Sequence, residues 1–189
     1  IENLVGSNFD DTLYGDANGN QLDGGSGNDI LIGGAGSDTL IGGAGTDTAS
    51  YINAAAGVTA NLASAASNTG EAAGDTYTTI ENLTGSSFDD KLTGDSNANA
   101  LDGGAGNDTL IGGAGNDTLT GGTGTDTADY SASAAAVTVY LNGTVGVGGD
   151  AAGDVLSGIE NITGSANADT LNGDGNANVL DGGAGNDTL

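Results

Sequence analysis

The sequence predicts an all-β fold, a solenoid of short parallel strands in which two nonapeptides close each coil. Three observations lead to this prediction. Glycines, an aspartate and a leucine recur with a nonapeptide period, longer segments recur at a second and much longer period, and most nonapeptides end in a short stretch with Leu in the middle. Because so short a strand is unstable alone, it needs neighbours stacked about 4.8 Å away on either side. The leucines expected to line one continuous interior seam are Leu13, Leu22, Leu31, Leu40, Leu92, Leu101, Leu110 and Leu119.

The long repeat sets the organisation of the chain. The segments IENL, IENL and IENI begin at Ile1, Ile80 and Ile159, so the chain holds two full units, 1–79 and 80–158, and the beginning of a third. After each leading block, nonapeptides begin at Gly6, Gly15, Gly24, Gly33 and Gly42, at Gly85, Gly94, Gly103, Gly112 and Gly121, and at Gly164, Gly173 and Gly182. We expect one continuous solenoid with repeat arrays at 1–50, 76–129 and 155–189, and insert coils at 51–75 and 130–154.

The two inserts break the nonapeptide phase. They are rich in Ala, but VTANL from Val58 and VTVYL from Val137 alternate apolar and polar residues, a pattern typical of a short strand. We interpret the inserts as wider, loop-bearing coils that continue the stack. A flexible linker between separate repeat islands is the alternative.

The composition limits the possible partners. Lys91 is the only basic residue, against 22 Asp and four Glu, which gives a formal net charge of −25. Such a chain is expected to be repelled by nucleic acid and by anionic membrane surfaces, since both require basic patches. No apolar run is long enough to span a bilayer, so no membrane insertion is expected. A cationic partner is implied, and a hard divalent ion is the simplest candidate.

One nonapeptide explains how such an ion would be held. The segment GGxGx supplies positive φ angles without steric cost and leaves backbone carbonyls uncovered. Because one coil spans two nonapeptides, the Asp at position six recurs on the same edge of the stack, where carboxylates would repel each other unless a cation lies between them. Calcium takes six to eight oxygen ligands and accepts carbonyls, whereas magnesium usually keeps several waters. The chain has no His or Cys for zinc.

The blocks GGSGNDILI, GGAGSDTLI, GGAGNDTLI and GGAGNDTLT resemble the nonapeptide GGxGxDxUx of the RTX (repeats-in-toxin, hemolysin-type calcium-binding) family. The resemblance covers about two-thirds of the chain. It implies a right-handed parallel β-roll in an extracellular bacterial protein, exported by type I secretion, unfolded in the calcium-poor cytosol and folded outside the cell.

The resemblance also implies the ligands. Each ion is held between a turn that gives the carbonyls of positions two and four plus its Asp, and the turn one coil later, which gives those of positions one and three plus its Asp. The clearest sites join Gly25, Gly27 and Asp29 to Gly42, Ala44 and Asp47, and join Gly104, Gly106 and Asp108 to Gly121, Thr123 and Asp126. Further candidate ligands are Asp11, Gly24, Ser26, Asp38, Asp90, Gly103, Ala105, Asp117, Asp169 and Asp187; Asp11 is expected to share an ion with Asp29, and Asp90 with Asp108.

Several positions depart from the family pattern. Position six is Asn20, Asn99 and Asn178 in the second nonapeptide of each unit, and it is Glu2, Glu81 and Glu160 in the leading blocks. Asp16, Asp95 and Asp174, at position two of the Asn-bearing nonapeptides, are expected to replace the missing charge. Ala49 and Ala128 replace the interior Leu at the end of each run, so the coil is expected to change shape there.

Pairing every block with the one two further on gives about ten calcium ions at most. Ten ions carry +20 and would reduce the net charge from −25 to about −5. Without them, repulsion and the small core are expected to leave the chain unfolded, so that binding and folding are one event.

The repeat also bears on function. Carboxylate pairs such as Asp10–Asp11 and Asp89–Asp90 recur with the repeat, with no His or Cys to accompany them, and we expect no enzyme activity in this chain. An acidic surface suited to high salt and a metal-free, ice-binding solenoid are alternatives that the phased aspartates disfavour. Two roles remain: a structural material that self-associates end to end as a surface filament or layer, or a secretion and stability module of a toxin, adhesin or hydrolase whose active domain lies outside this chain.

Overall fold

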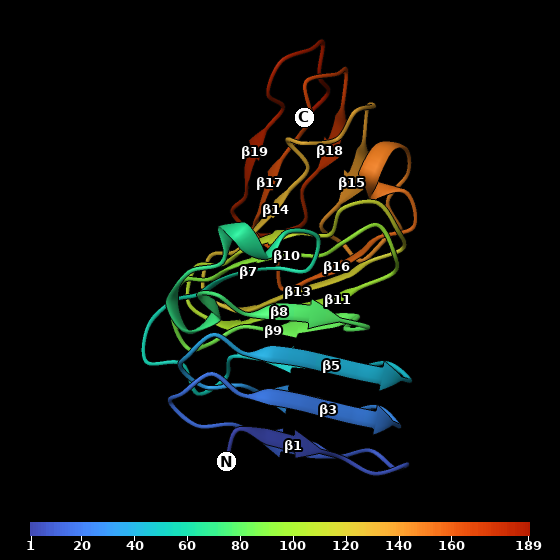
Figure 1. The fold of residues 1–189 in the computed structure, drawn as a ribbon. Coiled ribbons are helices and arrows are strands. Elements are labelled where there is room, and N and C mark those ends of the chain that lie inside the picture. Colours follow the sequence, from blue (N-terminus) through green and yellow to red (C-terminus); the bar gives the residue numbers. More distant parts are fainter.

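The computed structural model describes residues 1–189 as a solenoid of 19 short β-strands and three single-turn 3₁₀ helices (Figure 1). Every strand pair is parallel. The chain climbs from β1 at the N-terminal end to β18 and β19 near the C-terminus. No helix is long and apolar enough to cross a bilayer. The predicted all-β parallel solenoid is confirmed.

The strands form four sheets, named here A to D. Sheet A contains β1 (Asn3–Val5), β3 (Gln21–Ser26), β5 (Thr39–Ala44) and β8 (Thr76–Thr78). Sheet B contains β2 (Thr12–Tyr14), β4 (Ile30–Ile32), β6 (Thr48–Ser50), β9 (Asn82–Thr84), β11 (Ala100–Ala105), β13 (Thr118–Thr123) and β16 (Val155–Ser157). Sheet C contains β7 (Thr59–Asn61), β10 (Lys91–Thr93), β12 (Thr109–Ile111), β14 (Thr127–Asp129), β17 (Asn161–Thr163) and β19 (Val179–Asp181). Sheet D contains β15 (Thr138–Tyr140) and β18 (Thr170–Asn172), and the 3₁₀ helices are η1 (Ala65–Ser67), η2 (Gly70–Ala72) and η3 (Gly149–Ala151).

Within the repeat arrays, the pairing register gives two nonapeptides per coil. Leu4 lies beside Leu22, and Leu22 lies beside Leu40. Each step to the next strand of the sheet therefore covers two nonapeptides. This is the predicted pairing of each block with the one two further on.

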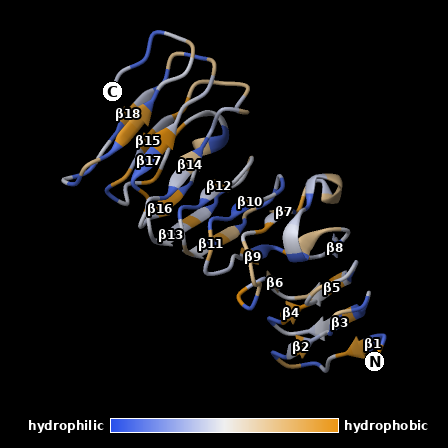
Figure 2. Cartoon of the chain, turned by 90° about the vertical axis from the view of Figure 1, so that its left-hand side faces the viewer, coloured by the Kyte–Doolittle hydropathy of each residue, from blue (hydrophilic) through white to orange (hydrophobic).

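The leucines at position eight form the core. Leu22, Leu31, Leu40, Leu92, Leu101, Leu110 and Leu119 are at most 1% exposed. Leu13 is partly buried and packs against the same cluster. Burying one such side chain stabilises the fold by about 1.5–3 kcal/mol. Figure 2 shows the hydrophobic colour gathered in the strands.

Four strands are longer than the short stretches that the sequence predicts. β3, β5, β11 and β13 continue into the glycines that follow, where Gly25 pairs with Gly43 and Gly104 with Gly122. A Cβ at Gly43 would overlap the carbonyl oxygen of Gly25. The absence of side chains therefore lets the backbones pair further into the turn than the leucine pattern indicates.

Each insert ends one sheet and begins another. After β6 of sheet B, the chain opens sheet C with β7, passes through η1 and η2, closes sheet A with β8 and returns to sheet B at β9. The second insert repeats this path: β15 opens sheet D, β16 closes sheet B, and β17 returns to sheet C. β7 and β15 lie where VTANL and VTVYL predict strands. The equivalent strands β1, β9 and β17 consequently lie in three successive sheets.

The change of path begins where Ala replaces Leu. Ala49 pairs on one side with Leu31, two nonapeptides earlier in the chain. On its other side it pairs with Leu83, which lies beyond the whole insert. The step between neighbouring strands thus lengthens at this point, in agreement with the change of coil shape expected at Ala49.

Candidate metal centre

The aspartates at position six form ladders along the edges of the solenoid. In the first unit, the backbone N–H of Asp11 donates to Oδ1 of Asp29 (2.8 Å) and that of Asp29 to Oδ1 of Asp47 (2.7 Å). The N–H of Asp47 then donates to Oε2 of Glu81 (2.8 Å). In the second unit, the same bonds, each 2.8 Å long, link Asp90, Asp108, Asp126 and Glu160. We call these two series the long ladders.

Two shorter ladders use the alternate nonapeptides. In the first unit, the N–H of Asn20 donates to Oδ1 of Asp38, and the N–H of Asp38 donates to Oδ1 of Asp75, both at 2.8 Å. In the second unit, Asn99, Asp117 and Asp154 are linked in the same way at 2.9 and 2.8 Å. In the third unit, the backbone N–H of Asp169 donates to Oδ1 of Asp187 at 2.9 Å, which is the equivalent of the Asp11–Asp29 bond of the long ladder.

Six of these carboxylates keep one oxygen without any hydrogen-bond partner. The six unpartnered Oδ2 atoms belong to Asp29, Asp38, Asp47, Asp108, Asp117 and Asp126, whose side chains are at most 1% exposed. Leaving a buried polar atom unsatisfied costs about 1–3 kcal/mol, and more when the group is charged. All six aspartates lie in blocks that begin with Gly-Gly. These oxygens are the clearest physical sign of a cation site.

Blocks with Ser at position two satisfy the same oxygen internally. Oδ2 of Asp11 and Asp90 accepts the backbone N–H of Ser7 and Ser86. In Gly-Gly blocks, position two has a positive φ, 99° at Gly25. No hydrogen bond of this kind forms there. The buried aspartates with an unpartnered Oδ2 therefore belong to blocks with Gly at position two, whereas Asp11 and Asp90 belong to blocks with Ser there.

The first glycine leaves room for the ligand atoms. A Cβ at Gly24 would overlap Oδ2 of Asp29 and lie 2.7 Å from the carbonyl oxygen of Gly42 in the next coil. The same holds at Gly103, with Oδ2 of Asp108 and the Gly121 carbonyl oxygen, again at 2.7 Å. Two predicted ligand atoms from successive coils thus meet beside each of these glycines.

The carbonyls of positions two and four face the following coil. A Cβ at Gly43 would overlap the oxygen of Gly25, and one at Gly45 would overlap the oxygen of Gly27. The same relationship links Gly104 to Gly122 and Gly106 to Gly124. These oxygens therefore point toward the gap in which an ion is expected.

The position-three residues are partly occupied by hydrogen bonds. The carbonyls of Ala44 and Thr123 accept the N–H groups of Gly27 (2.9 Å) and Gly106 (3.0 Å). Ser26 and Ala105 instead donate their N–H groups to the carbonyls one coil earlier, those of Ser7 (3.2 Å) and Ser86 (3.4 Å). A carbonyl oxygen has a second lone pair, so these bonds leave one acceptor position on Ala44 and Thr123.

Burial raises the pKa of the ladder carboxylates. The pKa rises to about 7 for Asp117 and to about 6 for Asp75, Asp108 and Asp154, with loss of hydration as the largest cause. The same cause raises the pKa of Asp38, Asp47 and Asp126. Negative charge is therefore costly at these positions, and a bound cation would offset that cost.

The ladders do not bring three carboxylates to a single point. No group of three or more His, Cys, Asp or Glu side chains is arranged to hold a metal ion. Each gap between coils offers two carboxylates, so the remaining ligands have to be backbone carbonyls. Calcium accepts such a set, whereas zinc in proteins is held by side chains of Cys, His, Asp and Glu. The residues present therefore fit calcium.

Asparagine at position six forms a hydrogen bond between coils through its side-chain amide. Nδ2 of Asn20 donates to the carbonyl oxygen of Ile1 (2.9 Å), and Nδ2 of Asn99 donates to that of Glu81 (2.8 Å). Asn178 makes the same bond to Glu160 at 3.0 Å. The amide thus joins two coils directly.

The expectation that Asp16, Asp95 and Asp174 replace the missing charge is wrong. Asp16 is exposed, and its carboxylate accepts the backbone and side-chain N–H groups of Asn18, both at 2.9 Å. These short-range hydrogen bonds lower the pKa of Asp16. Asp95 and Asp174 form the same turn with Asn97 and Asn176. The carboxylates close their own turns and do not join the ladders.

Part of the ladders lies outside the nonapeptide pattern. That pattern does not indicate Asp75 and Asp154, and it pairs Glu81 and Glu160 with the Asn-bearing blocks. The structure has that pairing, since Nδ2 of Asn99 donates to the carbonyl oxygen of Glu81 and β9 pairs with β11. It adds a second neighbour: the insert brings β9 beside β6, and the N–H of Asp47 donates to Oε2 of Glu81. The long repeat could have identified Asp75 and Asp154, because they occupy equivalent positions of the two units. Both are fully buried.

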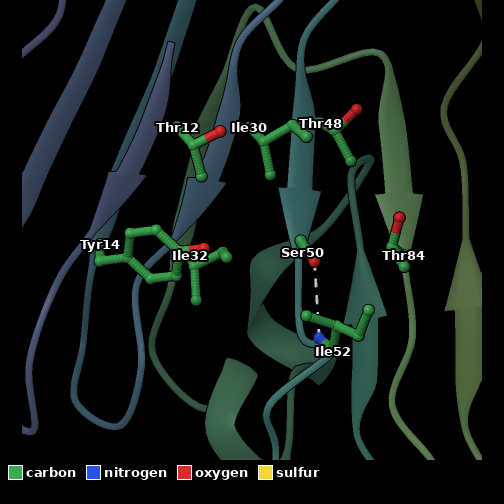
Figure 3. A pocket seen from close by; sticks show the side chains of 8 residues that line it. All are labelled: Thr12, Tyr14, Ile30, Ile32, Thr48, Ser50, Ile52 and Thr84. Atoms are coloured by element: carbon green, nitrogen blue, oxygen red, sulfur yellow. Dashed lines mark hydrogen bonds between the residues drawn. The ribbon is translucent and has the colours of Figure 1, made fainter.

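A shallow hollow on the outer face of sheet B lies apart from the ladders. It encloses about 350 Å³ and is lined by Thr12, Tyr14, Ile30, Ile32, Thr48, Ser50, Ile52 and Thr84 (Figure 3). None of these side chains is a carboxylate. In the second unit, Lys91, Thr93 and Thr109 stand where the first has Thr12, Tyr14 and Ile30. The hollow is therefore not a feature of the repeat.

Comparison with known proteins agrees with the geometry. A family described as the RTX calcium-binding nonapeptide repeat (4 copies) matches residues 1–31, 14–49, 75–110, 93–128 and 154–189. These matches leave only 50–74 and 129–153 uncovered, which are nearly the two inserts. No curated protein matches the chain. With well over half of its length matched, the chain belongs to the RTX calcium-binding nonapeptide repeat family.

Proposed function

We propose that this chain is a calcium-dependent structural region that folds outside the cell, with its principal ions in the long ladders. The observation that carries the proposal is the set of buried, unpartnered Oδ2 atoms, which occur only in Gly-Gly blocks. In the long ladders they mark four gaps: Asp29 to Asp47, Asp47 to Glu81, Asp108 to Asp126, and Asp126 to Glu160.

Calcium would be bound in each gap by the carboxylates of both coils and by carbonyls of the glycine turns. The protein's own contribution is to fix the carboxylates: each Oδ1 or Oε2 is held by a backbone N–H, which leaves Oδ2 free. Because these atoms come together only in stacked coils, binding energy is also folding energy. The expectation of about ten ions is thereby reduced, since the Asn-bearing gaps are already closed by amide bonds.

Folding that is coupled to calcium binding suits a protein that is exported in the unfolded state. Low calcium inside the cell would keep the net charge near −25 and the coils apart, and higher calcium outside would close the stack. Such a chain would need no nucleic acid or membrane as a partner.

A structural role is favoured by the succession of sheets. Each insert ends one sheet and opens the next, so units can be added without altering the geometry of the preceding ones. The second candidate, a secretion and stability module, requires a distinct active domain elsewhere in the parent protein. The architecture of that protein separates the two.

Small-angle X-ray scattering tests the proposal on this chain. In chelator the radius of gyration is expected near that of an unfolded chain, about 46 Å. Saturating calcium should shrink it to the dimensions of the solenoid, and magnesium at the same concentration should not. A chain equally compact in chelator and in calcium would contradict the proposal.

A further inference from the structure

We propose that each insert completes a calcium site of its own, between Asp38 and Asp75 in the first unit and between Asp117 and Asp154 in the second. The inference rests on the proposed calcium-dependent function and extends it to residues outside the Gly-Gly blocks. It would make the inserts part of the metal array and not mere spacers.

The insert turn stacks on the nonapeptide turn in the same way as another nonapeptide. Oδ1 of Asp75 accepts the N–H of Asp38 at 2.8 Å, as Oδ1 of Asp47 accepts that of Asp29 at 2.7 Å. The N–H of Thr76 also bonds the carbonyl of Asp38 at 2.8 Å, which places β8 in register with β5. Asp75 thus occupies the ladder position although its turn lacks the Gly-Gly motif.

An unpartnered oxygen lies at each of these gaps. Oδ2 of Asp38 and of Asp117 has no hydrogen-bond partner, and both side chains are 1% exposed. A Cβ at Gly33 or Gly112 would overlap this oxygen, so it has the same position beside the first glycine as in the long ladders. Two buried carboxylates with one oxygen unsatisfied are costly unless a cation lies between them.

A tyrosine fixes the second carboxylate. The hydroxyl of Tyr51 donates to Oδ2 of Asp75 at 2.8 Å, and that of Tyr130 donates to Oδ2 of Asp154 at 2.9 Å. Both tyrosines are buried. In the nonapeptides, the hydroxyls that bond ladder carboxylates are those of serines, Ser86 to Asp90 and Ser165 to Asp169. Each carboxylate oxygen can accept more than one bond, so the hydroxyl orients Asp75 while leaving it able to bind an ion. Tyr51 and Tyr130 are therefore positioning residues.

An acidic residue also precedes each insert aspartate by four residues. Glu71 and Asp150 occupy equivalent places of the two units, in η2 and η3. After burial, the charges of neighbouring carboxylates raise the pKa of the ladder residues, Glu71 acting on Asp75 and Asp150 on Asp154. The two ladder carboxylates of each gap offer hard oxygen ligands, which favour calcium.

Counting bound calcium tests the site directly. Native mass spectrometry of the full chain in calcium should show one ion fewer for Asp75→Asn, one fewer for Asp154→Asn and two fewer for the double variant. Asp102→Asn is the matched control. Asp102 is exposed on β11 and lies outside the ladders, so this substitution removes the same charge without touching a proposed site. An unchanged count in the double variant would overturn the inference. A wild-type chain that binds no calcium would instead overturn the proposed function.

Terbium luminescence provides a second readout. Tb³⁺ takes hard oxygen ligands like those of calcium, and the chain has no Trp, so tyrosine is the sensitiser. With Tyr51 and Tyr130 bonded to proposed ligands, excitation of tyrosine should produce strong Tb³⁺ emission in the wild type. Emission should fall by about half in either single Asp variant, which leaves the other unit intact, and should persist in Asp102→Asn. Emission that persists in the double variant would contradict a site at the inserts.

Discussion

The backbone N–H of Asp29 donates to Oδ1 of Asp47 at 2.7 Å, whereas Oδ2 of Asp29 has no partner at all. The Asp47 carboxylate thus holds the backbone of the preceding coil, and the Asp29 carboxylate leaves one oxygen free. The same division between a hydrogen-bonded oxygen and an unpartnered one is found at Asp47, Asp108 and Asp126. An Asn at these positions would satisfy the backbone equally well but would lack the free carboxylate oxygen.

Asp47 borders two proposed ion gaps, toward Asp29 and toward Glu81. In Asp47→Asn we therefore expect weaker binding at both. At a calcium concentration about 100-fold above Kd, each lost ion lowers the free energy of unfolding by about 2.7 kcal/mol. Urea unfolding at fixed calcium measures the change, with Asp102→Asn as the control. Equal stability of the two variants would contradict the assignment.

Gly103 leaves the space in which Oδ2 of Asp108 and the carbonyl of Gly121 meet. Gly103→Ala should force these atoms apart, at a cost of about 1–3 kcal/mol from overpacking alone, and should also weaken calcium binding. Gly175 is the matched control, because a Cβ there would meet nothing within 4 Å. Gly175→Ala should leave both the calcium midpoint and the stability at or slightly above the wild-type values. Equal thermal stability of the two alanine variants would show that the space beside Gly103 is not required.

The side-chain amide of Asn99 joins two coils by donating to the carbonyl of Glu81. In Asn99→Asp two acceptors face each other, and Oδ1 is already committed to the N–H of Asp95. We expect the free energy of unfolding to fall by about 1–3 kcal/mol at fixed calcium, and we expect no additional bound ion. Chemical denaturation combined with ion counting checks both parts. A more stable variant that gains an ion would show that the Asn position is a latent site.

Thr79 is the only residue other than Gly with a positive φ, 49°, and Gly158 occupies its place in the second unit with φ 60°. A left-handed conformation costs an ordinary residue about 1–2 kcal/mol, whereas Asn tolerates it. Thr79→Asn should therefore raise the free energy of unfolding by about 1 kcal/mol, since its side-chain oxygen can still accept the N–H of Gly43 that Thr79 Oγ1 now accepts. Thr78→Asn, within β8, should give no such gain. Thermal unfolding of the two variants in calcium compares them, and a destabilised Thr79→Asn would argue against strain at this position.

The nonapeptide period is sufficient to predict the coil. Leu22 and Leu40 lie side by side because two nonapeptides make one turn, and this spacing also places Asp29 beside Asp47. These relationships are local, since they depend only on repeated residues one coil apart.

The inserts could not be resolved by the same reasoning. Asp38 and Asp75 are far apart in the sequence, and their contact depends on how the chain passes through β7 and two 3₁₀ helices before it returns to sheet A. The nonapeptide pattern likewise does not predict the side-chain orientations of Asn20 and Asp16, because each has several hydrogen-bonding partners within reach. Comparison of the two units at equivalent positions identifies Asp75, Asp154 and their tyrosines.

Far-UV circular dichroism of the chelator-treated chain, titrated with calcium, shows whether calcium binding and folding are one event. The carboxylate ladders predict a cooperative transition from coil to β-structure that magnesium does not reproduce. A spectrum already rich in β-structure in chelator and unchanged by calcium would contradict the claim, because the leucine core would then hold the solenoid without the ions.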